Sequence, residues 1–195
     1  MDVTYRIESE EPESVAETEV IRYWLRKEIE EDTEDNLDPD TLDDRKELLD
    51  ALVDRKPLAE SIFGEADRNW YRLVLSEHEL RGLEVVRGPE NEGWRAVAKG
   101  GLIESIAERI LAADNLDAFD NEVPKNLTKV ADFADNVSSE TELEELIVVG
   151  DENGRPYIAD GNHRAVGMAL HILQSGEYIE QQAYVGVDRQ RINLQ

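Results

Sequence analysis

Apolar residues recur at spacings of three and four along several stretches of the chain, which places them on one face of a helix. This pattern predicts helices over 14–31, 41–54 and 102–113, and a further helical turn over 58–62. The first two are joined by the highly charged segment 30–40, which we interpret as a solvated loop. The first third of the chain is therefore predicted to be an acidic helical segment.

Short apolar or alternating runs predict strands over 70–75, 146–149, 157–159 and 179–187. The turn between the second and third strands is predicted at 151–154, because Asn-Gly tolerates positive φ angles. The ends of 85–98 are also predicted to be extended, around a Gly-Pro loop. The polar segment 114–141 is predicted to be a long loop with one short helix near 129–134.

These elements predict an α+β fold, with a small mixed sheet and packed helices over 69–195, preceded by the acidic helical segment 1–68.

The third strand runs into Asp160-Gly161-Asn162, and a helix follows over 165–173 with His163 and Arg164 in its first turn. The free N–H groups and the dipole of a helix start attract anions. A cation is unfavourable there, so Arg164 indicates that an anion lies between it and the amides. Gly161 allows the ligand to approach the backbone closely, and Asp160 orients its hydroxyl groups or helps to hold a metal ion.

A plainer interpretation of the same residues stays open. In it, Asp160-Gly161-Asn162 is a turn with an Asx N-cap, and Arg164 pairs with a surface acid. Two further pairs have two interpretations each. In one interpretation Trp94 and Arg95 flank a ligand; in the other, Trp94 belongs to the core. Likewise, Lys125 and Lys129 either reach a phosphate or are ordinary surface residues.

The amino-acid composition and net charge indicate the environment of the protein and which partners are expected. The net charge is −25, with 46 acidic residues against six Lys and fifteen Arg. An acidic, Lys-poor chain indicates a halophilic protein from a high-salt cytoplasm, where salt screens self-repulsion; an acidic mesophilic protein is the alternative. Nucleic-acid binders normally carry a basic surface, so DNA is not an expected partner.

The chain has no Cys and three His, which excludes thiol chemistry and argues against a zinc site. No apolar run approaches the length of a membrane span, and the first residues lack the pattern of a signal peptide. We therefore expect a cytoplasmic protein without membrane partners.

The run Asp160-Gly161-Asn162-His163-Arg164-Ala165 resembles the signature of the ParB/sulfiredoxin-like (ParB N-terminal domain-like) superfamily, and is closest to the Asp-Gly-His-His-Arg form of the free-serine kinases. The resemblance covers 144–188. Sulfiredoxins carry their catalytic Cys where this chain has Asn162, so sulfinic acid reductase activity is excluded.

The resemblance implies a nucleotide-binding domain whose loop of Gly161, Asn162, His163 and Arg164 holds the phosphates of ATP, ADP or CTP, with Mg²⁺ as a further cofactor. It implies an ATP- or ADP-dependent kinase, a phosphotransferase acting on a small hydroxyl-bearing molecule. Glu84 is the implied catalytic base, with Glu77 or Glu79 as substitutes, and Asp160 and His163 are further catalytic candidates.

The alternative is a non-catalytic nucleotide-binding or nucleotide-switched interaction protein. Its N-terminal helices would then bind a protein partner or form a homodimer. A nuclease ranks third, because the chain is acidic. The helix-turn-helix of chromosome-segregation ParB proteins does not fit into the residues after the last predicted strand.

Overall fold

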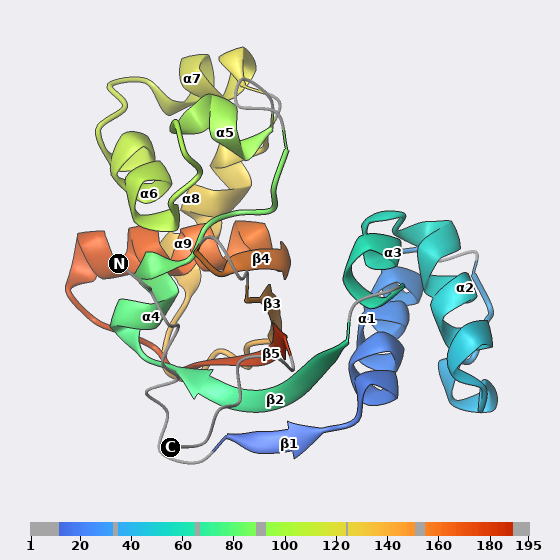
Figure 1. The fold of residues 1–195 in the computed structure, drawn as a ribbon. Helices are drawn as coiled ribbons and strands as arrows, with labels where there is room; N and C mark the ends of the chain where they lie inside the picture. The colour runs from blue at the N-terminus through green and yellow to red at the C-terminus, as the bar shows by residue number, and fades with distance from the viewer. Residues whose placement is uncertain are drawn as a thin grey trace. The chain divides into compact units, whose positions relative to one another are not determined.

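A computed structural model describes residues 12–32, 35–64, 67–88, 93–123, 125–150 and 155–188 (Figure 1). The predicted turn at 151–154 and the middle of the predicted Gly-Pro loop, 89–92, lie outside the described residues. None of the described helices is long and apolar enough to cross a membrane.

Five strands form one open mixed sheet in the order β1-β2-β5-β3-β4. Their bounds are Glu13–Val15 (β1), Arg68–Leu75 (β2), Leu146–Val149 (β3), Tyr157–Asp160 (β4) and Gln181–Asp188 (β5). Strands β3 and β4 pair antiparallel, with an irregularity between Ile147 and Val148. The α+β class and the four strands predicted from the apolar runs are confirmed.

Strand β1 corrects the predicted start of the first helix. Residues Glu13–Val15 pair antiparallel with the start of β2, opposite Trp70, Tyr71 and Arg72. The helix begins only after Ala16, at Glu17. Pairing with a distant strand has overridden the local helical pattern, as tertiary context commonly does.

The contacts divide the described chain into two compact units. Among the described residues, the helical unit comprises 13–72 with 186–188, and the main unit comprises 73–185 with Pro12. The predicted boundary at residue 68 falls four residues before this division, inside β2.

The helical unit contains α1, α2 and α3 and a short 3₁₀ turn; their bounds are Glu17–Glu31, Arg45–Arg55, Leu58–Phe63 and Pro39–Thr41. Its buried apolar residues include Ile21, Trp24, Leu48, Leu52 and Phe63, and Trp70 stacks on the Phe63 ring at 5.2 Å between centroids. Helix α2 starts later than the predicted residue 41, because Asp44 caps it by accepting from the Lys46 and Glu47 N–H groups.

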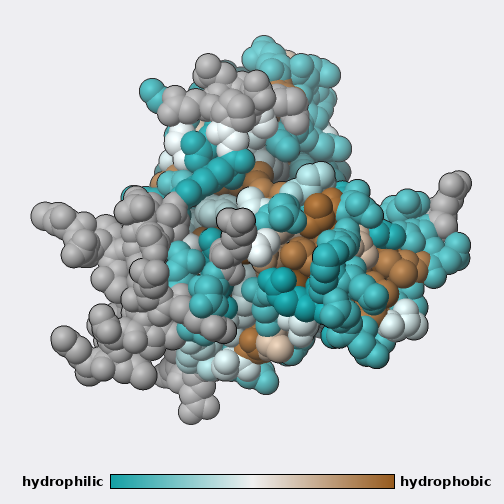
Figure 2. All heavy atoms as spheres, turned by 45° about the vertical axis from the view of Figure 1, so that its right-hand side comes forward, coloured by the Kyte–Doolittle hydropathy of each residue, from teal (hydrophilic) through white to brown (hydrophobic). Residues whose placement is uncertain are grey.

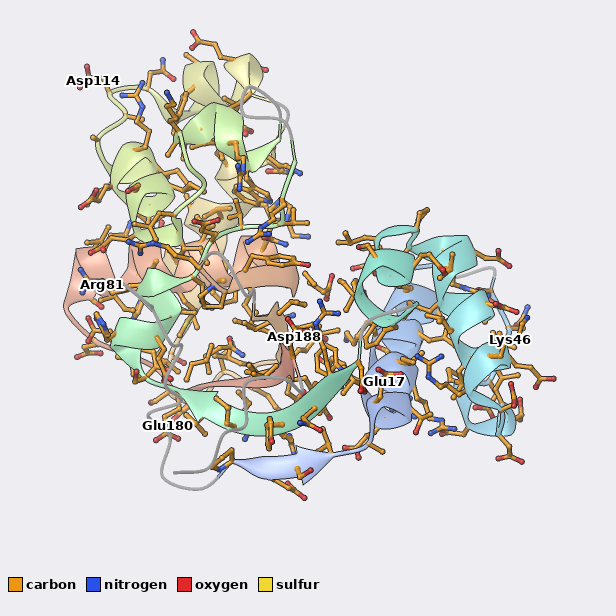
Figure 3. All side chains as sticks on the ribbon, in the orientation of Figure 1. Glu17, Lys46, Arg81, Asp114, Glu180 and Asp188 are labelled. Atoms are coloured by element: carbon orange, nitrogen blue, oxygen red, sulfur yellow. The ribbon has the colours of Figure 1, made fainter. Side chains whose placement is uncertain are left out.

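Exposed charges cover this unit. Glu17 pairs with Arg45, and Lys46 pairs with Asp50 one turn away (Figure 3). Much of the face drawn in Figure 2 is hydrophilic, with apolar colour confined to patches. Such exposed pairs contribute little to stability, so the apolar core holds the unit together.

The main unit contains six helices among its described residues: Glu77–Gly82 (α4), Trp94–Val97 (α5), Ile103–Leu111 (α6), Leu116–Glu122 (α7), Leu127–Asn136 (α8) and Asn162–Ser175 (α9). Helices α6 and α8 both pack on α9, whose buried residues include Val166, Met168 and Leu170 (Figure 1). Ser76 caps helix α4, in a capping box with Glu79.

One prediction within the main unit is wrong, and another is confirmed in part. The described ends of 85–98 are not strands: Glu84 makes isolated bridges to Leu102 and Tyr157, and the buried Trp94 begins the short helix α5 after Gly93, which has a positive φ. The helix predicted near 129–134 is present as the longer α8, with Asn126 as N-cap and Leu127, Val130 and Ala134 buried, whereas α7, capped by Asn115, was not predicted. Asp114 marks the turn before α7 (Figure 3).

Helix α8 approaches α9 closely at Gly167. A Cβ added there would lie 2.5 Å from the Phe133 Cδ1 atom and 3.3 Å from the Val130 carbonyl oxygen. A side chain as small as a methyl group therefore does not fit between the two helices.

We predict that Gly167→Ala destabilises the protein by about 1–3 kcal/mol, because Phe133 must shift to admit the methyl group. Chemical denaturation of the variant measures the loss. Gly82→Ala is the matched control, since Gly82 is also helical and has no atom within 4 Å of an added Cβ. Equal stability of Gly167→Ala and the wild type would contradict the close packing.

Candidate functional site

The junction between β4 and α9 is built on Gly161. Its backbone is left-handed, with φ 89° and ψ 20°, and it occupies the N-cap position of α9 without a side-chain cap. An added Cβ would also lie 2.5 Å from the Leu146 Cδ2 atom. Backbone conformation and space both require glycine, so the strand turns directly into the helix. The predicted Asx cap is absent, because Gly161 itself fills that position.

The first-turn amides of α9 belong to Asn162, His163 and Arg164. The first intrahelical bond is donated by the Ala165 N–H to the Gly161 carbonyl at 3.0 Å. The three preceding N–H groups have no acceptor within the helix, and they point toward the positive end of its dipole. This is the local geometry that the sequence predicted for an anion site.

The segment that carries Glu84 lies along β4. The Glu84 N–H donates to the Pro156 carbonyl at 3.0 Å, and the Ile158 N–H donates to the Glu84 carbonyl at 2.8 Å. Two residues later, the Val86 N–H donates to the Asn162 side-chain oxygen at 2.8 Å. Asn162 thus pins this segment to the start of α9, and its side-chain oxygen has a structural role.

The Glu84 carboxylate has a cationic neighbour in α5. It lies 3.6 Å from the Arg95 guanidinium, and the two side chains are 21% and 17% exposed. The Arg95 Nε is buried and has no hydrogen-bond partner among the described residues. Arg95 is therefore the cationic partner of the Glu84 carboxylate.

Trp94 and His163 are in contact. Their ring centroids are 4.8 Å apart with the planes at 68°, and Trp94 is only 3% exposed. The Lys125 ammonium lies 5.5 Å from the Trp94 ring centroid. Because one ring side is taken by His163 and another by Lys125, Trp94 is a packing residue; its buried ring offers no open face for stacking a base.

Burial, followed by the charges of Lys129 and Lys125, lowers the pKa of the His163 imidazole from 6.5 to about 4. His163 is therefore neutral at pH 7 and can donate one N–H bond without adding charge. Lys129 is in α8, and Lys125 lies two residues before it.

Lys125 and Lys129 differ from the three lysines of the helical unit. Lys27, Lys46 and Lys56 in the helical unit each pair with a carboxylate. In the part of the chain that the structure describes, no carboxylate pairs with Lys125 or Lys129. These two lysines, which no described carboxylate neutralises, form a cationic patch in a chain of net charge −25.

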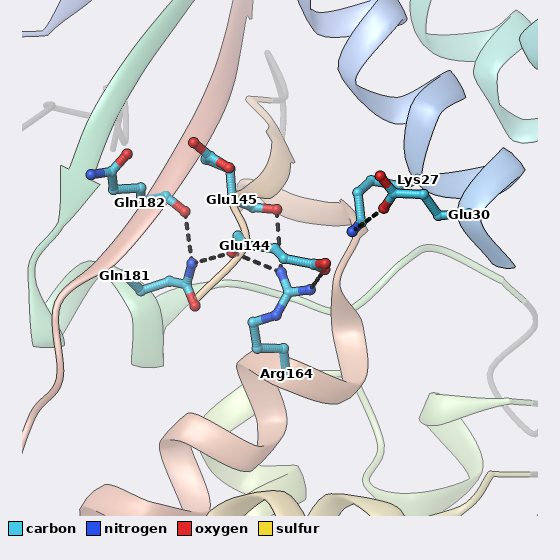
Figure 4. Close-up of polar contacts among 7 residues, drawn as sticks. All are labelled: Lys27, Glu30, Glu144, Glu145, Arg164, Gln181 and Gln182. Carbon is cyan, nitrogen blue, oxygen red and sulfur yellow. Dashed lines mark hydrogen bonds and ion pairs between the residues drawn. The ribbon is translucent and has the colours of Figure 1, made fainter. Parts of the chain in front are cut away.

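The Arg164 side chain reaches the chain before β3 (Figure 4). Its Nη1 donates to the Glu144 carbonyl at 2.8 Å and to the Glu145 carbonyl at 3.3 Å. Its Nη2 pairs with the Glu144 carboxylate. This agrees with the plainer interpretation, in which Arg164 pairs with a surface acid, and nothing in the sequence had marked Glu144 as the partner.

The remaining candidates are dispersed. Asp160 ends β4, half-buried and opposite Ile147. Glu77 pairs with Arg81, and the buried Glu79 carboxylate accepts from the Ser76 N–H.

Two cavities lie outside the junction. One of about 560 Å³ is in the helical unit and is lined by residues that include Arg45 and Trp70. One of about 500 Å³ is in the main unit and is lined by residues that include Arg81 and Arg155. No group of three or more His, Asp or Glu side chains within the described ranges is arranged to hold a metal ion.

Comparisons with protein-family models, with curated proteins and with solved structures found no match for this chain.

The low pKa of His163 predicts that the stability of the folded protein depends on pH. Between pH 6.5 and about 4 the unfolded state binds a proton at this residue and the folded state does not, so stability falls as the pH is lowered. We expect the melting temperature of the wild type to drop more between pH 7 and pH 5 than that of His163→Gln, in which this loss is missing.

The imidazole resonance that is lost in His163→Gln should titrate near pH 4 in the folded wild type. A midpoint at or above 6.5 would contradict the burial of this ring beside the two lysines.

Proposed function

We propose that this protein binds the phosphate groups of a nucleotide at the amino end of α9. The observation that carries the proposal is the effect of Lys125, just before α8, and Lys129, in α8, on His163, together with the lack of a paired carboxylate for either lysine among the described residues. In so acidic a chain, cations that no described carboxylate neutralises, next to helix amides without intrahelical acceptors, favour an anionic ligand.

The ligand class rests on the resemblance of residues 160–165 to the ParB/sulfiredoxin-like signature. In the proposed complex the amides of Asn162, His163 and Arg164 and the two lysines bind phosphate oxygens, and His163 donates a neutral hydrogen bond. Gly161 lets the phosphate approach the backbone, and Mg²⁺ is bound through the nucleotide phosphates rather than by a protein cluster.

A second candidate, phosphoryl transfer, is favoured by the pairing of Glu84 with β4. The hydroxyl oxygen of an acceptor would form a bond to the terminal phosphorus while the bond from that phosphorus to the leaving phosphate oxygen breaks. Glu84 would take the hydroxyl proton, with Arg95 holding the carboxylate in position.

The binding proposal predicts a stabilising nucleotide. In molar potassium chloride, ATP, ADP, CTP or GTP at about 100 times its dissociation constant should add about 2.7 kcal/mol of stability. The double variant Lys125→Gln with Lys129→Gln should lose about tenfold in affinity, which lowers the gain at that ligand concentration to about 1.4 kcal/mol. Thermal unfolding with and without Mg²⁺ provides the measurement.

The control carries Lys27→Gln with Lys46→Gln, which changes the charge equally at two lysines that already have acidic partners. Arg164→Ala is a poorer probe, because its loss also frees two backbone carbonyls. Equal nucleotide stabilisation of both double variants, or none for the wild type, would sink the proposal.

The second candidate predicts that Glu84→Gln lowers kcat about 10²- to 10⁴-fold with little change in nucleotide affinity. Phosphorus NMR of nucleotide turnover with a panel of small hydroxyl-bearing molecules measures the effect. Glu77→Gln, which also removes an acid from an arginine pair, is the control. Nucleotide binding without turnover in the wild type would favour the non-catalytic, nucleotide-switched interaction protein.

A further inference from the structure

The bonds of the Arg164 guanidinium divide it into two halves. Nη1 donates to two backbone carbonyls, those of Glu144 and Glu145, which cannot leave without moving the chain. Nη2 pairs with the Glu144 carboxylate, a side-chain group that can rotate away. The first half is therefore fixed, and the second holds an exchangeable anion.

Gln181 fixes the same piece of backbone from another strand. It is fully buried on β5, and its Nε2 donates to the Glu144 carbonyl at 2.8 Å and to the Gln182 carbonyl at 2.8 Å (Figure 4). The Glu144 carbonyl thus accepts from both Arg164 and Gln181. Departure of the Glu144 carboxylate would leave this carbonyl, and the guanidinium bound to it, where they are.

The solvent exposures of the Glu144 and Arg164 side chains also indicate that the Glu144 carboxylate is exchangeable. The Glu144 side chain is 45% exposed, whereas the Arg164 side chain is 19% exposed. An ion pair with one partner in solvent is weak, and a multivalent anion competes with it readily. Arg164 is also in the first turn of α9, where an added anion is favoured by the free amides.

We propose that the Glu144 carboxylate is an internal competitor for the phosphate site, occupying the exchangeable half of Arg164 until a phosphate oxygen replaces it. This inference rests on the proposed binding of phosphates at the amino end of α9. Glu144 would then set the affinity of the site, because each phosphate must displace one carboxylate. The fixed half of Arg164 keeps the guanidinium prepared for the incoming ligand.

Calorimetric titration with inorganic triphosphate tests the competition without relying on a base or sugar. Glu144→Gln should bind triphosphate about three- to fivefold more tightly than the wild type, which corresponds to removal of one exposed ion pair. Glu144→Asp keeps the charge but shortens the side chain, so it should also tighten binding, by a smaller factor. Circular dichroism of each variant establishes that the fold is retained.

Glu142→Gln is the matched control, since it removes the same charge from an exposed residue two positions away and should leave the affinity unchanged. If the wild type binds triphosphate but Glu144→Gln behaves like Glu142→Gln or binds more weakly, the competitor role is wrong while the phosphate site stands. If the wild type does not bind triphosphate at all, both proposals fall.

Discussion

The left-handed turn at Gly161 sets the position of everything around the candidate site. It sends the chain from β4 into α9 without a loop, and the Leu146 side chain fills the space where a Cβ would be. The start of α9 therefore lies at the edge of the sheet, with its first amides outside the helical hydrogen-bond ladder. The segment 84–86 is bonded along β4 and to Asn162, so Glu84 is held at the same edge.

The packing of α8 on α9 determines which charged side chains lie near the start of α9. Gly167 lets Phe133 of α8 lie close to α9, and Lys125 just before α8 and Lys129 within it both act on the charge of His163. Arg164, in the first turn of α9, pairs with Glu144. The start of α9 thus has two kinds of cation near it, lysines that no described carboxylate pairs with and an arginine that has an acidic partner, and the two contribute differently to our proposals.

Local pattern was sufficient to predict the strand, the turn and the helix at the motif. Leu146–Val149 is an unbroken buried run, Gly161 is required by the turn, and the apolar face of α9 has helical spacing. What local pattern missed depends on distant partners: β1 forms only by pairing with β2, and the predicted short helix near 129–134 extends to the full length of α8, which packs on α9.

In the candidate site, too, the sequence revealed single residues but not their arrangement. The residues of 160–164 could be picked out from one short stretch, and Trp94, Lys125 and Lys129 were recognisable one by one. Their meeting at His163 depends on how α5, α8 and α9 pack, which no spacing encodes. The roles of Glu144 and Gln181 were invisible, because an exposed acid among 46 and a strand glutamine carry no distinguishing pattern.

The most direct test of a phosphate site at the amino end of α9 is to locate the ligand by NMR. Amide resonances of the isotope-labelled protein would be followed during titration with ATP and Mg²⁺ in molar potassium chloride. Our account predicts the largest shifts at Gly161, Asn162, His163 and Arg164, with smaller shifts at Lys125 and Lys129. Shifts confined to the residues around the 560 Å³ cavity of the helical unit, or no shifts at all, would contradict it.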